Sequence, residues 1–323
     1  MDLTTHYMGL ALKNPIIVSS SKLTSSIDNI VKCAEHGAAA IVLKSLFEEQ
    51  LLADADKLMD MDPKYFWYPE AVEYVNEHSK DHGVQEYIDL IAEAKENVDV
   101  PVIASINCTT PKEWPKFARK LEEAGADGLE LNIAIIPMSG NISSKEIEKT
   151  YVKIITKVKK NTTLPVSVKF GPLFTNPFKI IHEMDQAGVD ALVIFNRFYR
   201  PDINIETETI VHHNILSSPV EMTQSLRWVS LLSDTVKCDV AANTGIHDAE
   251  GVIKQLLAGA DAAQICSTLY MHGISYIDTI LTELREWMAR HHYSSLDDFK
   301  GKFARDNEHA VAFARVQYMK RNV

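Results

Sequence analysis

The residues best suited to chemistry in this sequence follow short apolar runs. In chain order they are Ser19-Ser20-Ser21, Lys44-Ser45, Ser105-Ile106-Asn107, Asn132, Lys169, Asn196-Arg197, Thr244-Gly245 and Cys266-Ser267-Thr268. The set offers hydroxyl, amide and cationic groups but no carboxylate and no histidine. A carboxylate pair for hydrolysis and a metal site are therefore not expected there. Hydrogen-bond donors and positive charge suit a polar, electron-rich anion, such as a flavin with its phosphate.

The elements that position these residues follow a repeated pattern. Four segments each contain a helix end, a glycine turn and a short apolar run, with the turns centred on Gly37, Gly125, Gly188 and Gly259. A glycine after a helix is a common left-handed cap. The runs are apolar on both faces, as parallel strands covered by helices are. Between them lie four further runs, "NPIIVSSS", "VPVIASIN", "LPVSVKFG" and "KCDVAANTG".

Together these runs predict eight strands alternating with amphipathic helices, such as those expected over 144–161 and 248–259. The strands are expected to start near Pro15, Ala39, Pro101, Gly128, Pro165, Ala191, Cys238 and Ala262. This order predicts an α/β fold, a TIM (β/α)8 barrel, built as a single domain over residues 1–323. An open doubly wound sheet is the alternative, but no G-x-G-x-x-G follows the first strand. Residues 3–15 resemble a hairpin that plugs the barrel floor, and residues 286–303 a C-terminal helical extension.

In a barrel, the strand C-terminal ends form the site, and a phosphate often binds after the seventh and eighth strands. Those loops carry Gly245, Ser267 and Thr268. Lys169, at the end of the fifth strand, is placed to stabilise the negative charge of a reduced flavin. An alternative is an aldolase-type lyase in which Lys169 or Lys44 forms a Schiff base.

Bulk properties exclude several classes of function. A net charge of −11 over 323 residues argues against a nucleic-acid partner. The four cysteines are far apart, which suits a reducing cytoplasm. We expect no signal peptide and no membrane span. We also expect no bound metal, since the histidine pairs lack an H-E-x-x-H spacing. The long connection from Phe47 to Gly83 is expected to act as a lid or a subunit contact.

Several short segments, taken in order, resemble one enzyme family. "NPIIVSSS", "VLKS", "ELNI", "VKF", "TGI", "AAQICSTLYMHG" and "YSSLDDFKGK" are similar in order and spacing to the dihydroorotate dehydrogenases, especially their soluble class 1 branch. The resemblance implies FMN at the barrel mouth and a homodimer. It also implies hydride transfer from dihydroorotate to flavin N5, while a side chain removes a proton from the adjacent carbon.

The resemblance also implies roles for individual residues. Those expected to contact FMN are Ser19, Ser20, Lys44, Ser45, Asn132, Lys169, Thr244, Gly245, Cys266 and Ser267. Lys44, Asn132 and Asn196 are expected near the substrate, and Asn76 is matched to an asparagine that contacts its acid and amide groups.

The sequence departs from the family at the proton-removing position. Ile135 stands where class 1 members have the cysteine base, Ala134 replaces a serine and Pro137 replaces an asparagine. Ser217 and Ser218 stand where the family has paired glycines that help to hold the phosphate. Thr244 stands where the family has the first glycine of a "GGI" motif. Arg197 follows Asn196 where the family has serine, and this change suits an anionic substrate.

These departures leave three hypotheses. The protein acts on a different small anionic substrate, or a base comes from elsewhere, such as Ser139, Cys108 or His78, or it oxidises dihydroorotate poorly and serves as a flavin-binding protein with little turnover. Without a general base, proton removal loses a contribution of about 10²–10⁴-fold.

Overall fold

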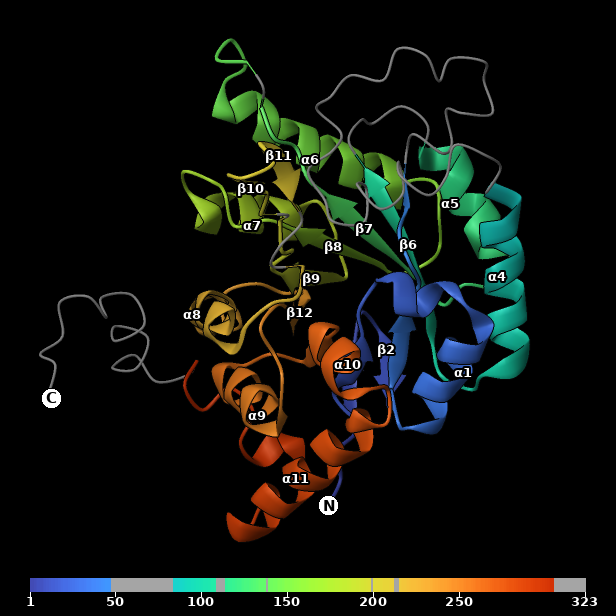
Figure 1. Cartoon of the computed structure of the whole chain (residues 1–323), viewed down its shortest axis with the longest axis vertical. Coiled ribbons are helices and arrows are strands. Elements are labelled where there is room, and N and C mark those ends of the chain that lie inside the picture. The colour runs from blue at the N-terminus through green and yellow to red at the C-terminus, as the bar shows by residue number, and fades with distance from the viewer. Residues whose placement is uncertain (48–83, 109–113, 138, 199, 212–214, 305–323) are drawn as a thin grey trace, which may run out of the picture.

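The structure is a computed structural model that describes residues 1–47, 84–108, 114–137, 139–198, 200–211 and 215–304. Within these ranges, eight parallel strands close into a barrel surrounded by helices, which confirms the predicted TIM barrel (Figure 1). The barrel strands are β3 (Ile16–Val18), β4 (Ala40–Val42), β6 (Val102–Cys108), β7 (Gly128–Ile133), β8 (Val166–Phe170), β9 (Ala191–Ile194), β12 (Asp239–Ala242) and β13 (Ala262–Ile265).

The order of the strands around the barrel is β4-β3-β13-β12-β9-β8-β7-β6, and β6 pairs back onto β4. The two-residue strand β5 (Leu46–Phe47) lies alongside the end of β6. Every expected strand start falls within one residue of the start in the structure. Strands β3, β7 and β8 are buried at every position, as expected for a parallel sheet covered on both faces.

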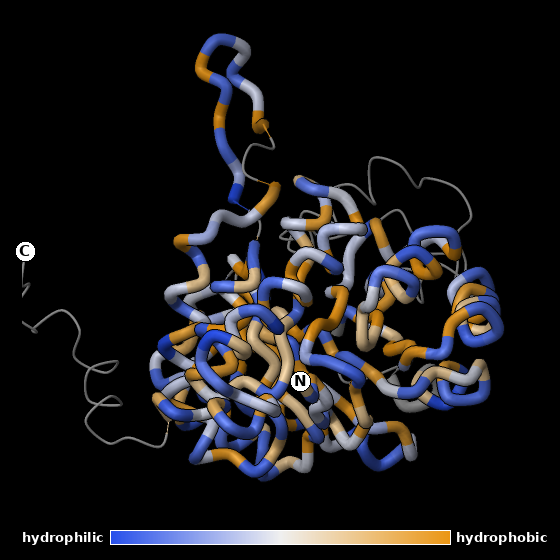
Figure 2. Tube along the Cα trace, turned by 90° about the horizontal axis from the view of Figure 1, so that it is seen from below, coloured by the Kyte–Doolittle hydropathy of each residue, from blue (hydrophilic) through white to orange (hydrophobic). Residues whose placement is uncertain are grey.

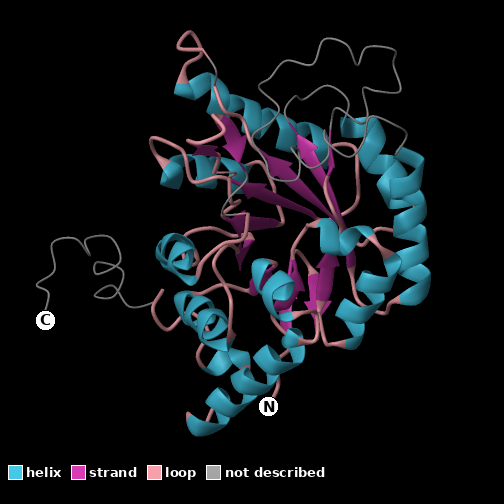
Figure 3. Cartoon of the chain, in the orientation of Figure 1, coloured by secondary structure: helices cyan, strands magenta, loops and turns pink. Residues whose placement is uncertain are grey.

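Helices cover the outside of the barrel (Figure 3). They are α1 (Ile27–Glu35), α4 (Val84–Asn97), α5 (Trp114–Glu123), α6 (Ser144–Lys159), α7 (Pro177–Gln186), α8 (Met222–Leu232), α9 (Ala249–Ala258), α10 (Ser267–His272) and α11 (Tyr276–Arg290). The predicted helices over 144–161 and 248–259 are thus α6 and α9. A capping box between Ser143 and Glu146 starts α6, and Gly259, with φ of 109°, ends α9.

The predicted N-terminal hairpin forms from β1 (Thr5–Tyr7) and β2 (Leu10–Leu12), and it closes the barrel floor. Tyr7, Met8 and Leu12 are buried in one cluster with inward-facing residues of the barrel strands, such as Ile17 and Val193. This apolar plug confines the polar interior to the opposite end of the barrel, where the strands end.

A second hairpin, β10 (Asp202–Asn204) and β11 (Thr209–Val211), follows β9 and stands away from the barrel (Figure 2). The C-terminal extension is present as α11 and a short 3₁₀ turn at Leu296–Asp298. Among the helices of the described ranges, none has the length and apolar character needed to cross a membrane.

Candidate functional site

Lys169 lies inside the barrel mouth in a closed set of buried polar contacts. Its Nζ donates to Ser19 Oγ at 2.9 Å, and Ser19 Oγ donates to Gln264 Oε1 at 3.1 Å. Gln264 Nε2 donates to Glu130 Oε2 at 2.7 Å, and Glu130 Oε1 lies 3.9 Å from Lys169 Nζ. These four side chains connect strands on opposite sides of the barrel, so they must face its interior.

Glu130 is the carboxylate that the sequence analysis missed. It is 1% exposed and pairs with Lys169, which is 4% exposed. A buried ion pair is costly to break from one side, because the remaining charge loses its partner and has no water. The available signal was strand alternation, since Glu130 and Asn132 are two residues apart in β7 and therefore point to the same face.

A ladder of three buried hydroxyls lines the β3, β4 and β6 side of the mouth. Ser20 Oγ lies 3.1 Å from Ser45 Oγ, which lies 2.8 Å from Ser105 Oγ. The Tyr87 hydroxyl accepts from the Ser105 N–H and donates to the Ser105 carbonyl, and burial raises its pKa well above the usual range. The two predicted cofactor residues Ser20 and Ser45 are thus held together in one fixed arrangement.

Two predicted substrate-orienting amides also meet. Asn196 Nδ2 donates to Asn132 Oδ1 at 2.8 Å, and Asn132 lies opposite Lys169 in the β7–β8 register. The third predicted substrate residue, Lys44, follows β4 and is half-buried. Among the described residues, its ammonium group has no ion-pair partner.

The predicted phosphate residues cluster where α10 begins. Ser217 Oγ lies 3.0 Å from Ser267 Oγ and 3.0 Å from His247 Nε2, and the Ser217 N–H donates to Ser267 Oγ. The Thr268 hydroxyl donates to the His247 carbonyl. Burial lowers the pKa of His247, a residue of this cluster that the sequence analysis did not single out.

Thr244 and Gly245, after β12, both adopt positive φ, 73° and 78°. The Thr244 hydroxyl donates to the Phe195 carbonyl and so ties this loop to the end of β9. A Cβ on Gly245 would lie 2.3 Å from the Met222 nitrogen, so only glycine fits at this contact. Cys266 precedes α10 as its N-cap residue and is half-buried.

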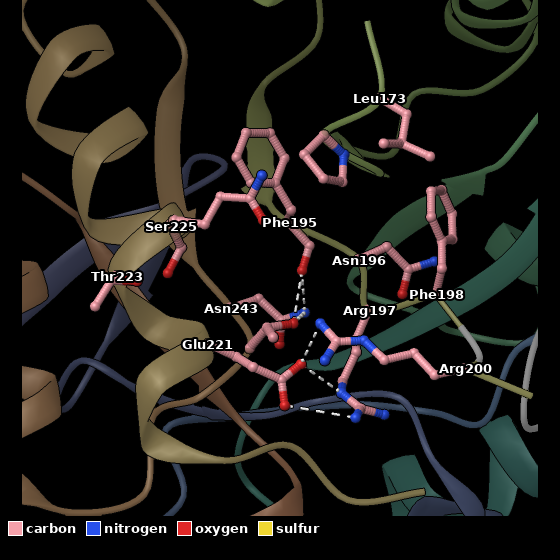
Figure 4. Close-up of a pocket in the computed structure, with 13 residues that line it drawn as sticks. Leu173, Phe195, Asn196, Arg197, Phe198, Arg200, Glu221, Thr223, Ser225 and Asn243 are labelled. Atoms are coloured by element: carbon pink, nitrogen blue, oxygen red, sulfur yellow. Dashed lines mark hydrogen bonds and ion pairs between the residues drawn. The ribbon is translucent and has the colours of Figure 1, made fainter. Parts of the chain in front are cut away.

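Arg197, predicted to hold an anionic substrate, is engaged by protein groups. Its Nε donates to Glu221 Oε2 at 2.9 Å, its Nη1 donates to the Ile215 carbonyl, and Arg200 contacts the same carboxylate oxygen at 3.0 Å (Figure 4). Burial opposes ionisation of Glu221, but hydrogen bonds from Arg197 and the Ser218 N–H outweigh it and lower the pKa of the carboxyl.

The Arg197–Glu221 pair borders a cavity of ≈ 380 Å³ that also reaches Asn196 and Thr244. Its other walls come from the loops after β8 and β9 and from the start of α8 (Figure 4). Arg200 is exposed and Arg197 is not, so Arg200 is the more accessible cation of this cavity.

The loop after β7 lacks an obvious base. Ala134 is buried, Ile135 is half-buried and Pro137 is exposed. The Tyr151 hydroxyl of α6 accepts from the Ile135 N–H and donates to the Ile133 carbonyl, both at 3.3 Å. Burial raises the pKa of Tyr151 to about 12, so this hydroxyl stays protonated and holds the loop rather than removing a proton.

The other predicted sources of a base are only partly described. Ser139 is exposed, and its hydroxyl accepts from the Asn141 N–H. His78, together with the predicted substrate residue Asn76 and the lid over Phe47–Gly83 beyond its first residue, lies outside the described residues, as does the side chain of Cys108. Within the described ranges, no group of three or more potential metal-ligating side chains occurs.

Comparison with known proteins shows to which family the chain belongs. A profile of the dihydroorotate dehydrogenase family matches residues 2–288. The chain belongs to the dihydroorotate dehydrogenase family. Its relatives include catalytic subunits of dihydroorotate dehydrogenase B (NAD(+)). The subunit from Thermoplasma volcanium is 26% identical over 93% of this chain and 98% of its own length, and that from Methanocella arvoryzae is 30% identical over 84% and 88%.

The residues at the mouth fit the flavin that a dihydroorotate dehydrogenase fold implies. The Lys169 ammonium suits an anionic ring edge, and the serine ladder and the asparagine amides suit the carbonyl and nitrogen atoms of such a ring. The hydroxyls of Ser217 and Ser267 suit a phosphate. The described residues at the mouth therefore have the chemistry to hold such a ring and its phosphate, whereas Ala134 and Ile135 in the loop after β7 have no group that could remove a proton.

Proposed function

We propose that this protein is an FMN-dependent oxidoreductase that acts on the CH–CH group of a small, cyclic, anionic substrate, with the oxidation of dihydroorotate to orotate as the first candidate reaction. The observation that carries the proposal is the Lys169 cation, buried at the barrel mouth and fixed by Ser19 and Glu130. We also propose that residues 1–323 form one FMN-binding domain and that the protein is cytoplasmic.

We propose a role for each of the predicted site residues. When bound, FMN supplies a two-electron acceptor. Lys169 would stabilise negative charge on the reduced ring, Lys44 would lie at the edge shared by ring and substrate, and Asn132 and Asn196 would orient the substrate. The remaining cofactor contacts are Ser19, Ser20, Ser45, Ser217, Ser218, Thr244, Gly245, Cys266 and Ser267. Asn76 and Arg197 are kept as substrate-binding residues; binding through Arg197 requires the substrate to compete with Glu221.

The test is an anaerobic flavin-reduction assay. The purified protein is expected to be yellow and to contain close to one FMN per chain. Mixing with dihydroorotate is expected to bleach the flavin slowly, because Ile135 occupies the base position. A colourless protein that takes up no FMN would refute the cofactor. A yellow protein that other reductants bleach and dihydroorotate does not would refute only the substrate.

A Schiff-base lyase remains the second candidate, favoured by the half-buried Lys44 without an ion-pair partner among the described residues. In this case a carbonyl substrate would condense with the amine, and borohydride would trap the adduct. Trapping lost in Lys44→Arg but kept in Lys169→Arg would assign the amine. The third candidate, flavin binding with little turnover, predicts FMN uptake without reduction by any substrate.

We also propose a homodimer, for which the β10–β11 hairpin offers a surface. Ile203 and Ile210 are cross-strand partners and are 67% and 68% exposed. A two-stranded hairpin with uncovered apolar residues is marginal in water on its own. Light scattering is expected to show a dimer in the wild type and a monomer in Ile203→Asp/Ile210→Asp, with FMN content unchanged.

A further inference from the structure

One buried amide nitrogen at the barrel mouth has no hydrogen-bond partner in the part of the chain that the structure describes. Asn107, the second-last residue of β6, is 2% exposed. Among the described residues, its Nδ2 has no hydrogen-bond acceptor. Buried polar groups are nearly always paired, so an exception of this kind points to a group supplied from outside the chain.

Strand register shows which way Asn107 faces. Asn107 lies opposite Asn132 in the β6–β7 pair, and Asn132 lies opposite Lys169 in the β7–β8 pair. Residues directly opposite each other on neighbouring strands point to the same face of a sheet. Lys169 faces the interior, since it contacts Ser19 from the other side of the barrel. Asn107 therefore belongs to the same inward layer, at the end of the barrel where TIM-barrel sites lie.

Other buried asparagines of the chain do not share this feature. Asn14, at the opposite end of the barrel, is 3% exposed, donates from Nδ2 to the Gly37 carbonyl at 2.7 Å and accepts from the Ile16 N–H at 2.9 Å. Asn132 and Asn196 bond to each other. The missing acceptor is thus specific to Asn107, among the residues that form this layer.

We infer that Asn107 is a ligand-contacting residue whose amide donates to a carbonyl oxygen or imine nitrogen of a planar ring bound at the mouth. The inference rests on the proposed function. A flavin and a pyrimidine-type substrate both carry such acceptors. An amide is a neutral donor with a fixed direction, so it selects a ring by the position of its acceptor rather than by charge.

The test compares Asn107→Leu with Asn14→Leu, two substitutions of a buried amide by an apolar side chain of similar size. In the FMN-free protein, Asn107→Leu is expected to keep or raise Tm, because it removes an unpaired polar group. Asn14→Leu is expected to lower Tm, because it leaves the Gly37 carbonyl and the Ile16 N–H unpaired. A structural role for Asn107 would instead lower Tm in both variants.

Ligand affinity then identifies the source of the acceptor. FMN is titrated into the FMN-free protein, and orotate into the FMN-loaded protein, for the wild type and Asn107→Leu. A loss of roughly tenfold in FMN affinity assigns the acceptor to the flavin, and the same loss for orotate alone assigns it to the substrate. Asn107→Ala repeats both titrations if the leucine variant does not fold.

Affinities within twofold of the wild type for both ligands would overturn the inference and leave the proposed function intact. A wild-type protein that binds no FMN would overturn both. Retained FMN affinity in Asn14→Leu is the expected control, since Asn14 lies at the barrel floor.

Discussion

Inside the barrel mouth, buried polar side chains from β7, β8 and β13 and from Ser19 after β3 contact one another, whereas the loop after β7 presents Ala134, Ile135 and Ile136. The first region holds the buried Lys169, which pairs with Glu130. The second has no group that gains or loses a proton near neutral pH. The two regions therefore differ in whether they can offer charged and hydrogen-bonding groups to a ligand.

The difference between the two regions is most directly tested at Ile135. Ile135→Cys restores the residue of the class 1 family at the base position and is expected to speed anaerobic flavin reduction by dihydroorotate by about 10²–10⁴-fold. Stopped-flow absorbance of the flavin measures the rate. The matched control is Ile136→Cys, one residue further along the same loop, which is expected to change the rate less than threefold.

Equal rates in the two cysteine variants would show that the missing base is not what limits this protein. The difference would then lie in the identity of the substrate, and the same assay with other cyclic acids would follow.

The buried polar side chains of the mouth are tested through the stability of the protein rather than through a reaction rate. Lys169→Met leaves Glu130 buried without its cation, and is expected to lower the free energy of unfolding by about 3–5 kcal/mol. Urea denaturation measures this. The double variant Lys169→Met/Glu130→Gln is expected to recover most of the loss, because no uncompensated charge remains. Additive losses in the double variant would show that the two residues do not act as a pair.

The two regions also differ in how far the sequence predicted them. Strand positions were predictable because parallel strands buried on both faces leave apolar runs, and all of these runs except the one at Cys238 follow a glycine cap or a proline. The prediction that Ile135 replaces the base could be made because this residue lies in a short motif. The pairing of Glu130 with Lys169 and Gln264 was not, because it depends on barrel closure, which brings residues 134 positions apart into hydrogen-bond contact.

Arg197 shows the same limit on a smaller scale. Its position after β9 suggested a cation free for a substrate, yet Glu221, 24 residues later, reaches it from the turn before α8. Charge in a sequence gives the type of interaction that a residue can make, and only the packing of loops gives its partner. The polar region is therefore where a sequence-based description of this site is least complete.

The predicted phosphate site is tested at Gly245, in the loop after β12. Gly245→Ala places a methyl group against the Met222 backbone at a φ of 78°. We expect a loss of roughly 1–2 kcal/mol from the left-handed backbone and roughly 1–3 kcal/mol more from the close contact. Gly188→Ala is the control, since its φ is 88° but the space around it is open, so only the first loss is expected. Equal losses would show that the Met222 contact relaxes freely.

The smallest expected effect concerns pH and His247, which contacts Ser217 on this side. Burial lowers the pKa of His247 in the folded protein, whereas the unfolded chain titrates near 6.5. Between these two pKa values the unfolded state binds more protons, so stability rises with pH. The free energy of unfolding is therefore expected to fall on acidification below about pH 6.5 and to fall less in His247→Asn. Urea denaturation at a series of pH values measures both slopes. Parallel curves for the wild type and His247→Asn would show that the buried imidazole contributes nothing to acid sensitivity, and that the polar side of the mouth tolerates a charge there.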